Sequence, residues 1–163
     1  MTTTIVGLDV HDVRFPTAAT GDGSDAINRG DYSATYVELR TDGPHVGAGL
    51  TFTNGRGNEI TCAAARALSH HVVGRTVEDI FAAPVTFWRS LAADAQLRWL
   101  GPEKGVIHMA TGTLVNAVWD LRARLASVPC GGCWPRCRPP NWWPASTSAT
   151  SATRSPQTRR SNC

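Results

Sequence analysis

The chain has 163 residues with a formal net charge of +3, and 42% of them are hydrophobic and 18% charged. This length suits one domain, and no apolar run approaches the roughly 18 residues that a membrane span requires. Residues 1–15 lack the basic segment and long apolar run of a secretory signal, so we expect a cytoplasmic protein without a membrane partner.

The composition changes abruptly after Val128. Residues 1–128 carry 11 Lys and Arg against all 13 acids, a net charge of −2, whereas residues 129–163 carry five Arg and no acid. No Leu, Ile, Val, Phe or Met follows Val128, although six of the ten Pro and four of the five Cys do. We interpret residues 1–128 as one domain. Residues 129–163 form a tail that we expect to be disordered, because it has no aliphatic side chains with which to build a core.

Three strands are predicted in the first part of the domain. Residues 4–15 alternate between apolar and polar, with inward candidates at Ile5, Leu8, Val10 and Val13. A Gly- and Asp-rich loop follows at 17–31. Residues 36–40 and 46–53 are further strands around a turn at 41–44, whose Asp-Gly pair is typical of a hairpin. The simplest arrangement is an antiparallel meander.

Helical spacing takes over after the third strand. Residues 58–73, 84–94 and 102–125 each repeat apolar side chains every three or four positions. The first face contains Ile60, Ala64, Ala67, Leu68, His71 and Val72, the second Phe87, Trp88 and Leu91, and the third Ile107, Ala110, Leu114, Val118, Leu121 and Leu125. Pro102 suits the first turn of the longest helix, and Trp99 and Trp119 are expected in the core or an interface. Strands followed by helices predict an α+β domain with helices packed on one sheet face.

Five blocks of this sequence resemble L-fuconate dehydratases of the enolase superfamily. They cover residues 1–128 in the family's order and comprise 12–17 (DVRFPT), 22–28 (DGSDAIN), 31–39 (DYSATYVEL), 49–59 (GLTFTNGRGNE) and 96–121 (QLRWLGPEKGVIHMATGTLVNAVWDL). The resemblance implies an N-terminal capping domain of three antiparallel strands followed by a helical bundle. This agrees with the fold class that apolar spacing predicts.

The resemblance also implies a second part of the enzyme that these residues do not contain. In the family a modified TIM barrel holds Mg²⁺ and the acid and base groups that dehydrate an acid sugar to a 2-keto-3-deoxy acid. A barrel needs about 250 residues, and 35 follow Val128. We therefore expect the barrel to be absent and the chain to be inactive alone, with no catalytic residue, metal ligand or cofactor of its own. The full-length family can form oligomers.

The resemblance assigns substrate recognition to a loop of the capping domain. It implies that Gly23, Ser24, Asp25 and Tyr32 reach over the barrel mouth and contact the acid sugar. A carboxylate and a hydroxyl between flexible glycines suit recognition of several sugar hydroxyls. Without the resemblance, a solvated Gly/Asp loop is the favoured interpretation of the same residues. The stretch between Asp25 and Tyr32 is one residue shorter than the family's usual spacing.

The tail has the composition of a GC-rich gene translated in the wrong frame. Gly132-Cys133-Trp134-Pro135 can be encoded by GGC-TGC-TGG-CCG, in which a shifted frame reads Leu-Leu-Ala. Permitted codons allow the whole tail to be recoded as an aliphatic sequence that resembles the family's continuation. We therefore interpret residues 129–163 as a frameshift product.

Several other features support weaker hypotheses. Asn58 is expected to cap a helix after the turn 54–57, although the glycines there also suit an anion. Cys130, Cys133 and Cys137 resemble part of a zinc knuckle, whose fourth ligand would be Cys163. The frameshift hypothesis explains these cysteines without a metal.

His70, His71 and His108 lack carboxylates at ligand spacing and are expected to be ordinary helix residues. The remaining alternatives for function are a non-catalytic sugar- or partner-binding module, or a nucleic-acid binder using the Arg-rich tail. We expect no nucleic-acid partner, because five arginines without a folded platform make a poor binding surface.

Overall fold

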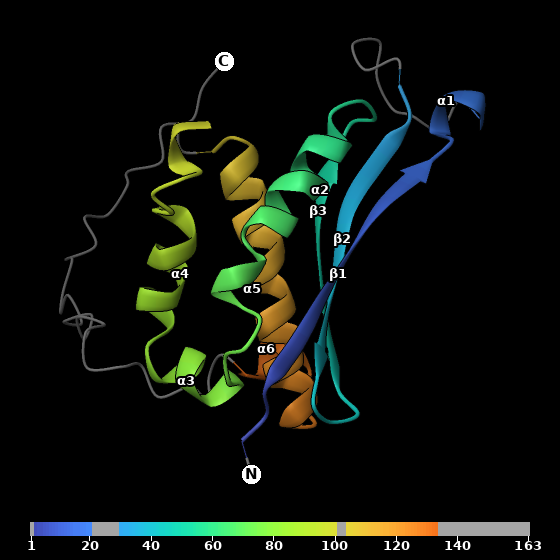
Figure 1. Ribbon diagram of the computed structural model, residues 1–163. Coiled ribbons are helices and arrows are strands. Elements are labelled where there is room, and N and C mark those ends of the chain that lie inside the picture. The colour runs from blue at the N-terminus through green and yellow to red at the C-terminus, as the bar shows by residue number, and fades with distance from the viewer. Residues whose placement is uncertain (1, 21–29, 101–103, 134–163) are drawn as a thin grey trace, which may run out of the picture.

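A three-stranded antiparallel sheet forms the first layer of the protein. The computed structural model describes residues 2–20, 30–100 and 104–133. Strands β1 (Ile5–Phe15), β2 (Tyr32–Thr41) and β3 (Val46–Thr53) pair in the order β1-β2-β3, with Val10 opposite Val37 and Val37 opposite Gly49. This confirms the predicted meander and the α+β class (Figure 1). The predicted second strand began at residue 36, four residues after the start of β2. The first part of β2 was missed because its buried side chains include the polar Ser33 and Thr35.

Helices cover one face of this sheet. The α-helices are α2 (Asn58–Ala67), α3 (Val77–Ala82), α4 (Pro84–Ala92) and α5 (Val106–Leu125). Two 3-10 turns accompany them, η1 (Ser69–His71) after α2 and η2 (Arg98–Leu100) before α5. Two four-residue helices, α1 (Thr17–Thr20) and α6 (Cys130–Cys133), complete the described part. In Figure 1, α5 lies between the sheet and α4, so it is the central element of the helical layer.

The close approach of α5 to β3 depends on two glycines. A Cβ atom at Gly47 would meet the carbonyl oxygen of Ala117 and the side chain of Leu121. A Cβ atom at Gly49 would meet the backbone of Thr113 and Ala117. Glycine in a strand often marks such an approach of another backbone. The two glycines in the β3 sequence VGAGLTFT therefore leave room for the backbone of α5 to lie against the strand.

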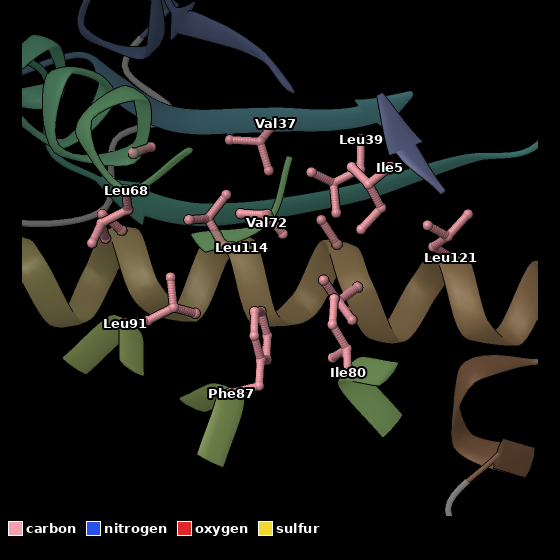
Figure 2. Close-up of a cluster of buried hydrophobic side chains, with 14 of the residues drawn as sticks. Ile5, Val37, Leu39, Leu68, Val72, Ile80, Phe87, Leu91, Leu114 and Leu121 are labelled. Carbon is pink, nitrogen blue, oxygen red and sulfur yellow. The ribbon is translucent and has the colours of Figure 1, made fainter. Parts of the chain in front are cut away.

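The core lies on both sides of α5. Figure 2 shows Val37 and Leu39 of the sheet facing α5 from one side, while Ile80, Phe87 and Leu91 of α3 and α4 approach from the other. The predicted stripe of α5 is confirmed, since its five residues Ile107, Ala110, Leu114, Val118 and Leu121 are all at most 2% exposed, and Leu125 packs partly against them.

Several details of the helices differ from the predictions. The helix predicted over 58–73 ends at Ala67 and continues as η1, and the buried stripe of α2 contains Thr61, Cys62 and Ala65. Of the predicted face, Ala64, Leu68 and Val72 are buried as expected, but Ile60 lies outside the buried stripe and is 57% exposed. Trp88 and Trp99 are also outside the core, at 45% and 75% exposed. These side chains lie on helix faces that no described element covers.

The boundaries of two helices have local causes. Helix α5 begins at Val106, because Lys104 has a left-handed backbone with φ of 71°; Pro102 lies outside the described residues. Helix α3 was not predicted, although Thr76 accepts a hydrogen bond from the backbone N–H of Asp79 at 3.1 Å. The sequence Thr-Val-Glu-Asp at 76–79 carries this capping signal.

Two further predictions concern the end of the chain and the absence of a barrel. The described residues contain the three-stranded sheet and its helices, with no TIM barrel among them. Residues 130–133 form α6 against α5, which differs from the disorder expected for the start of the tail. The remainder of the tail, 134–163, lies outside the described residues. None of the helices in the described ranges combines the length and apolar character of a bilayer crossing.

Candidate functional site

Of the predicted recognition residues, Tyr32 lies at one end of the sheet. Tyr32 is the first residue of β2, and its ring packs edge-on against Phe52, with 5.1 Å between ring centroids. Gly23, Ser24 and Asp25 lie outside the described residues. The structure therefore places the C-terminal anchor of the predicted loop without testing the loop's own contacts.

Two hydrogen bonds join the chain segments on either side of that loop. The backbone N–H of Tyr32 donates to Thr17 Oγ1 at 3.0 Å. The backbone N–H of Ala18 donates to Asp31 Oδ1 at 3.1 Å. Residues 17–18 and 31–32 are thus held together at the end of the β1–β2 pair. The two ends of the connection between β1 and β2 are therefore held close together.

The second candidate loop, residues 54–58, lies at the same end of the sheet. The N–H of Gly55 donates to Ser33 Oγ at 2.8 Å, and Arg14 Nη1 donates to the carbonyl oxygen of Gly55 at 2.6 Å. Ser33 follows Tyr32 directly, so the two loops share an anchor. Figure 1 shows α1, the start of β2 and the start of α2 together at this end. The structure therefore brings residues 54–58 to the same edge as residues 17–18 and 31–32, which lie at the two ends of the other loop.

Asn58 has a different role from the helix cap that the sequence suggested. Gly57, with φ of 99°, occupies the cap position, and Asn58 is fully buried as the first residue of α2. Its Oδ1 accepts from Thr35 Oγ1 at 2.8 Å and from Thr53 Oγ1 at 2.6 Å. Its Nδ2 donates to the carbonyl oxygen of Ala34 at 3.1 Å. The side chain turns toward the sheet because these strand groups satisfy it there.

Charges at this edge are balanced within the chain. Arg14 lies between Asp12 and Glu59, with its Nη2 2.9 Å from Glu59 Oε2. The hydrogen bond from Arg14 is the largest influence holding the pKa of Asp12 below its usual value, with a further contribution from Asn58. The pKa of Glu59 is also lowered, first by its own backbone N–H and then by Arg14. Both carboxylates stay ionised and both already have partners.

This balance bears on the anion-binding alternative for residues 54–58. Glu59 Oε2 accepts from the N–H of Gly57 at 3.2 Å, so a carboxylate of the chain itself occupies the first turn of α2. The carboxylates of Asp12 and Glu59 both accept hydrogen bonds from Arg14 as well. These contacts fix residues 54–58 against β1 and β2.

The structure overturns one expectation about histidines. His70 and His71, which the sequence left without a carboxylate, both face Asp94, 23 positions after His71 in the chain. His108 Nδ1 is buried and has no hydrogen-bond partner among the described residues. Cys62 is buried and Cys130 exposed, and both are free thiols. Cys137 and Cys163 of the hypothetical zinc knuckle lie outside the described residues.

The described residues do not fit the Mg²⁺ of the resembled family. Mg²⁺ selects carboxylate, carbonyl and water oxygens in octahedral geometry. Among the described residues, the one group of three candidate ligands is His70, His71 and Asp94, which offers two imidazole nitrogens. No magnesium-dependent step is therefore derived from these side chains.

The fold is shared with the capping domains of known enzymes. The crystal structure of human mitochondrial enolase superfamily member 1 aligns with a TM-score of 0.78 and 46% identity, over 81% of this chain and 31% of that one. The structure of an L-talarate dehydratase from a Polaromonas species, complexed with Mg and L-glucarate, aligns with a TM-score of 0.58 and 21% identity, over 76% of this chain and 30% of that one. The described part has the α+β fold of an enolase-superfamily N-terminal capping domain.

Sequence relatives narrow this class. No family model matches the sequence. The chain is 52% identical over 127 residues to an L-galactonate dehydratase of Hypocrea jecorina, covering 77% of this chain and 28% of that protein. It is 49% identical over 125 residues to human mitochondrial enolase superfamily member 1, covering 75% of this chain and 28% of that protein. Its homologues are thus enolase-superfamily members, of whose length the chain spans less than a third.

Proposed function

We propose that this chain is the substrate-capping part of an acid-sugar dehydratase that depends on Mg²⁺ and acts in sugar catabolism. The observation that carries the proposal is the 52% identity to a dehydratase, together with a capping-domain fold. Residues 54–58 and Tyr32, which ends the proposed recognition loop, lie at one edge of the sheet in this fold. We assign it substrate recognition because the resemblance places the recognition loop in this domain and the Mg²⁺ ligands in the barrel.

L-fuconate is the substrate that we propose. This choice depends on the sequence blocks shared with L-fuconate dehydratases, whereas the Hypocrea jecorina relative carries the name L-galactonate dehydratase. The two acids differ only at C6, where L-fuconate has a methyl group and L-galactonate a hydroxymethyl group. A hydroxyl left unpaired in a closed site costs affinity. The ratio of kcat/KM values for these two acids therefore measures the specificity directly.

The proposed division of labour assigns different chemistry to different parts of a longer enzyme. Mg²⁺ supplies charge stabilisation for proton removal next to a carboxylate. Gly23, Ser24, Asp25 and Tyr32 would bind and orient the sugar hydroxyls and exclude water. A cytoplasmic location goes with this proposal. We also propose that a frameshift near residue 130 separates this domain from its barrel.

The test compares the 163-residue chain with a frame-restored version of the same gene. Both are assayed with Mg²⁺ and either L-fuconate or L-galactonate. The 163-residue chain should give no product, and the frame-restored chain should turn over L-fuconate faster than L-galactonate. Turnover by the shorter chain would contradict the fragment proposal. An inert but folded longer chain would contradict the dehydratase proposal.

The same assay examines the recognition residue Asp25. Asp25→Ala in the frame-restored chain should reduce kcat/KM by roughly ten- to a hundred-fold, because a charge-assisted hydrogen bond to the sugar is lost. The melting temperature should not change. Asp9→Ala is the matched control, since Asp9 is an exposed acid that pairs with Arg40. Unchanged kinetics for Asp25→Ala would remove this residue from the site.

A further inference from the structure

Two histidines and one aspartate converge away from the candidate recognition loops. His70 and His71 belong to η1, and Asp94 follows the end of α4. The Nε2 atoms of His71 and His70 lie 2.8 and 3.3 Å from the same oxygen, Asp94 Oδ2. Their ligand atoms all lie within 4.8 Å of one another. The cluster therefore brings two nitrogens and one oxygen to a common point.

Backbone hydrogen bonds fix the orientation of the Asp94 carboxylate. Its Oδ1 accepts hydrogen bonds from the backbone N–H groups of Gln96 at 2.8 Å and Leu97 at 3.0 Å. This leaves Oδ2 as the oxygen that faces the imidazoles. The side chain is only 7% exposed. The hydrogen bond from His71 is the largest influence lowering the pKa of Asp94, so the carboxylate is ionised at neutral pH.

The orientation of the His70 ring suits a metal ligand. Its Nδ1 lies 3.0 Å from the carbonyl oxygen of Ala67, and a carbonyl oxygen only accepts, so Nδ1 carries the proton. Nε2 is then the nitrogen that faces the carboxylate oxygen of Asp94, 3.3 Å away. A backbone carbonyl on the remote nitrogen is also the usual support of a metal-binding histidine.

The donor set and spacing favour zinc-like ions. Zn²⁺ takes imidazole nitrogens and carboxylate oxygens at about 2.0–2.1 Å in a tetrahedron, which separates the ligands by about 3.3 Å. The 3.3 Å between His70 Nε2 and Asp94 Oδ2 agrees with this spacing, whereas His71 Nε2, at 2.8 Å from the same oxygen, would have to move back by about 0.5 Å to bind the ion. The His70 side chain is 62% exposed, so solvent can provide a fourth ligand. Mg²⁺ would require more oxygen ligands than the cluster has.

We propose that His70, His71 and Asp94 form a binding site for Zn²⁺ or a similar divalent transition metal. The metal would link η1 to the turn after α4 and so join two parts of the helical layer. This site is separate from the recognition edge and does not depend on the proposed dehydratase function. The bound ion would stabilise the folded chain, because it binds the folded state and not the unfolded one.

The experiment measures Zn²⁺ binding by calorimetry and Co²⁺ binding by visible absorption in the full 163-residue chain. The cysteines after Val128 could bind the same ions, so the parent carries serine at four positions, namely Cys130, Cys133, Cys137 and Cys163. We expect one Zn²⁺ per chain, a tetrahedral Co²⁺ spectrum and no response to Mg²⁺. At 100 times the Kd, Zn²⁺ should raise the melting temperature by about 5–10 °C.

Matched substitutions identify the ligands. His70→Ala should weaken Zn²⁺ binding at least ten-fold without unfolding the chain, because this side chain is largely exposed. Asp94→Asn keeps an oxygen for the N–H groups of Gln96 and Leu97 and should also lose binding. His45→Ala, at an exposed residue, should bind like the parent. Absence of Zn²⁺ binding by the parent, or equal binding by His70→Ala and His45→Ala, would overturn the proposal.

Discussion

The two faces of the sheet present different chemistry although the same strands form both. On the inner face, Val37 and Leu39 are fully buried beneath α5. On the outer face, the neighbouring β3 residues Leu50 and Phe52 are 52% and 54% exposed, and Phe15 is 45% exposed. Side chains alternate along a strand, so neighbouring positions contribute differently to stability. Hydrophobic character alone does not show which apolar side chains support the fold.

The largest contrast should come from equal truncations on the two layers. Leu114→Ala removes a fully buried α5 side chain between the sheet and the outer helices. The lost apolar burial and the resulting cavity should lower the free energy of unfolding by about 2–5 kcal/mol. Urea denaturation of the 163-residue chain, followed by circular dichroism, measures this loss.

Leu50→Ala removes the same atoms from the outer face. Because Leu50 is half-exposed, the free energy of unfolding should change by no more than about 0.5 kcal/mol. A loss as large as that for Leu114→Ala would show that the outer face is buried in solution. The comparison between faces would then need to include whatever covers it.

The second contrast compares a glycine within β3 with a glycine in the turn that precedes this strand. Gly49→Ala places a Cβ atom against the α5 backbone at Thr113 and Ala117, which cannot move aside as a side chain can. Helix α5 must shift, and the free energy of unfolding should fall by about 1–3 kcal/mol. Thermal and urea unfolding give this value, and a reduced melting temperature should accompany it.

Gly43→Ala is the matched control in the turn between β2 and β3. A Cβ atom there would meet only Thr41 Oγ1, at an ordinary 3.8 Å. Loss of chain entropy in the unfolded state should leave this variant as stable as the parent or slightly more stable. Equal destabilisation by the two substitutions would mean that lost strand flexibility, not contact with α5, explains the effect at Gly49.

Much of the fold follows from local patterns in the sequence. The α5 stripe was predicted because its apolar spacing matches the face that becomes buried. Strand β3 was predicted from the Asp-Gly turn before it, although its large apolar side chains Leu50 and Phe52 are exposed. The start of β2 was missed because Ser33 and Thr35 are buried through hydrogen bonds rather than apolar character. The exposed Ile60 shows the same limit, since a periodic pattern does not identify which edge of a helical face contacts the sheet.

The candidate sites depend more strongly on tertiary structure. The sequence placed Tyr32 beside the proposed recognition loop, and the structure places it at the loop's anchored end. It could not place Asp94 against His70 and His71, because the chain passes through α3 and α4 between them. Such groupings are decided by packing of separate elements and leave no spacing signal in the sequence.

The smallest contrast concerns acids associated with the two faces. Asp12 hydrogen-bonds with Arg14 and with the buried Asn58, and its pKa in the folded chain is below the ordinary value of 3.8. A lowered pKa means that the stabilisation is complete above the unfolded pKa and is lost as the pH falls through the folded pKa. Asp12→Asn should therefore lower the free energy of unfolding at pH 7, by at most about 1 kcal/mol. The difference from the parent should disappear below the folded pKa.

Asp9→Asn provides the control on the outer face. Asp9 pairs with Arg40 at 2.6 Å, but the side chains are 41% and 55% exposed, so solvent screens the pair. Urea denaturation at a series of pH values from 7 to about 2 compares each variant with the parent. The difference for Asp12→Asn should shrink as the pH falls below 3.8, whereas that for Asp9→Asn should stay near zero throughout. Parallel curves for both variants would show that the contacts of Asp12 add no stability of their own, because a stabilised carboxylate must lose its contribution when it takes up a proton.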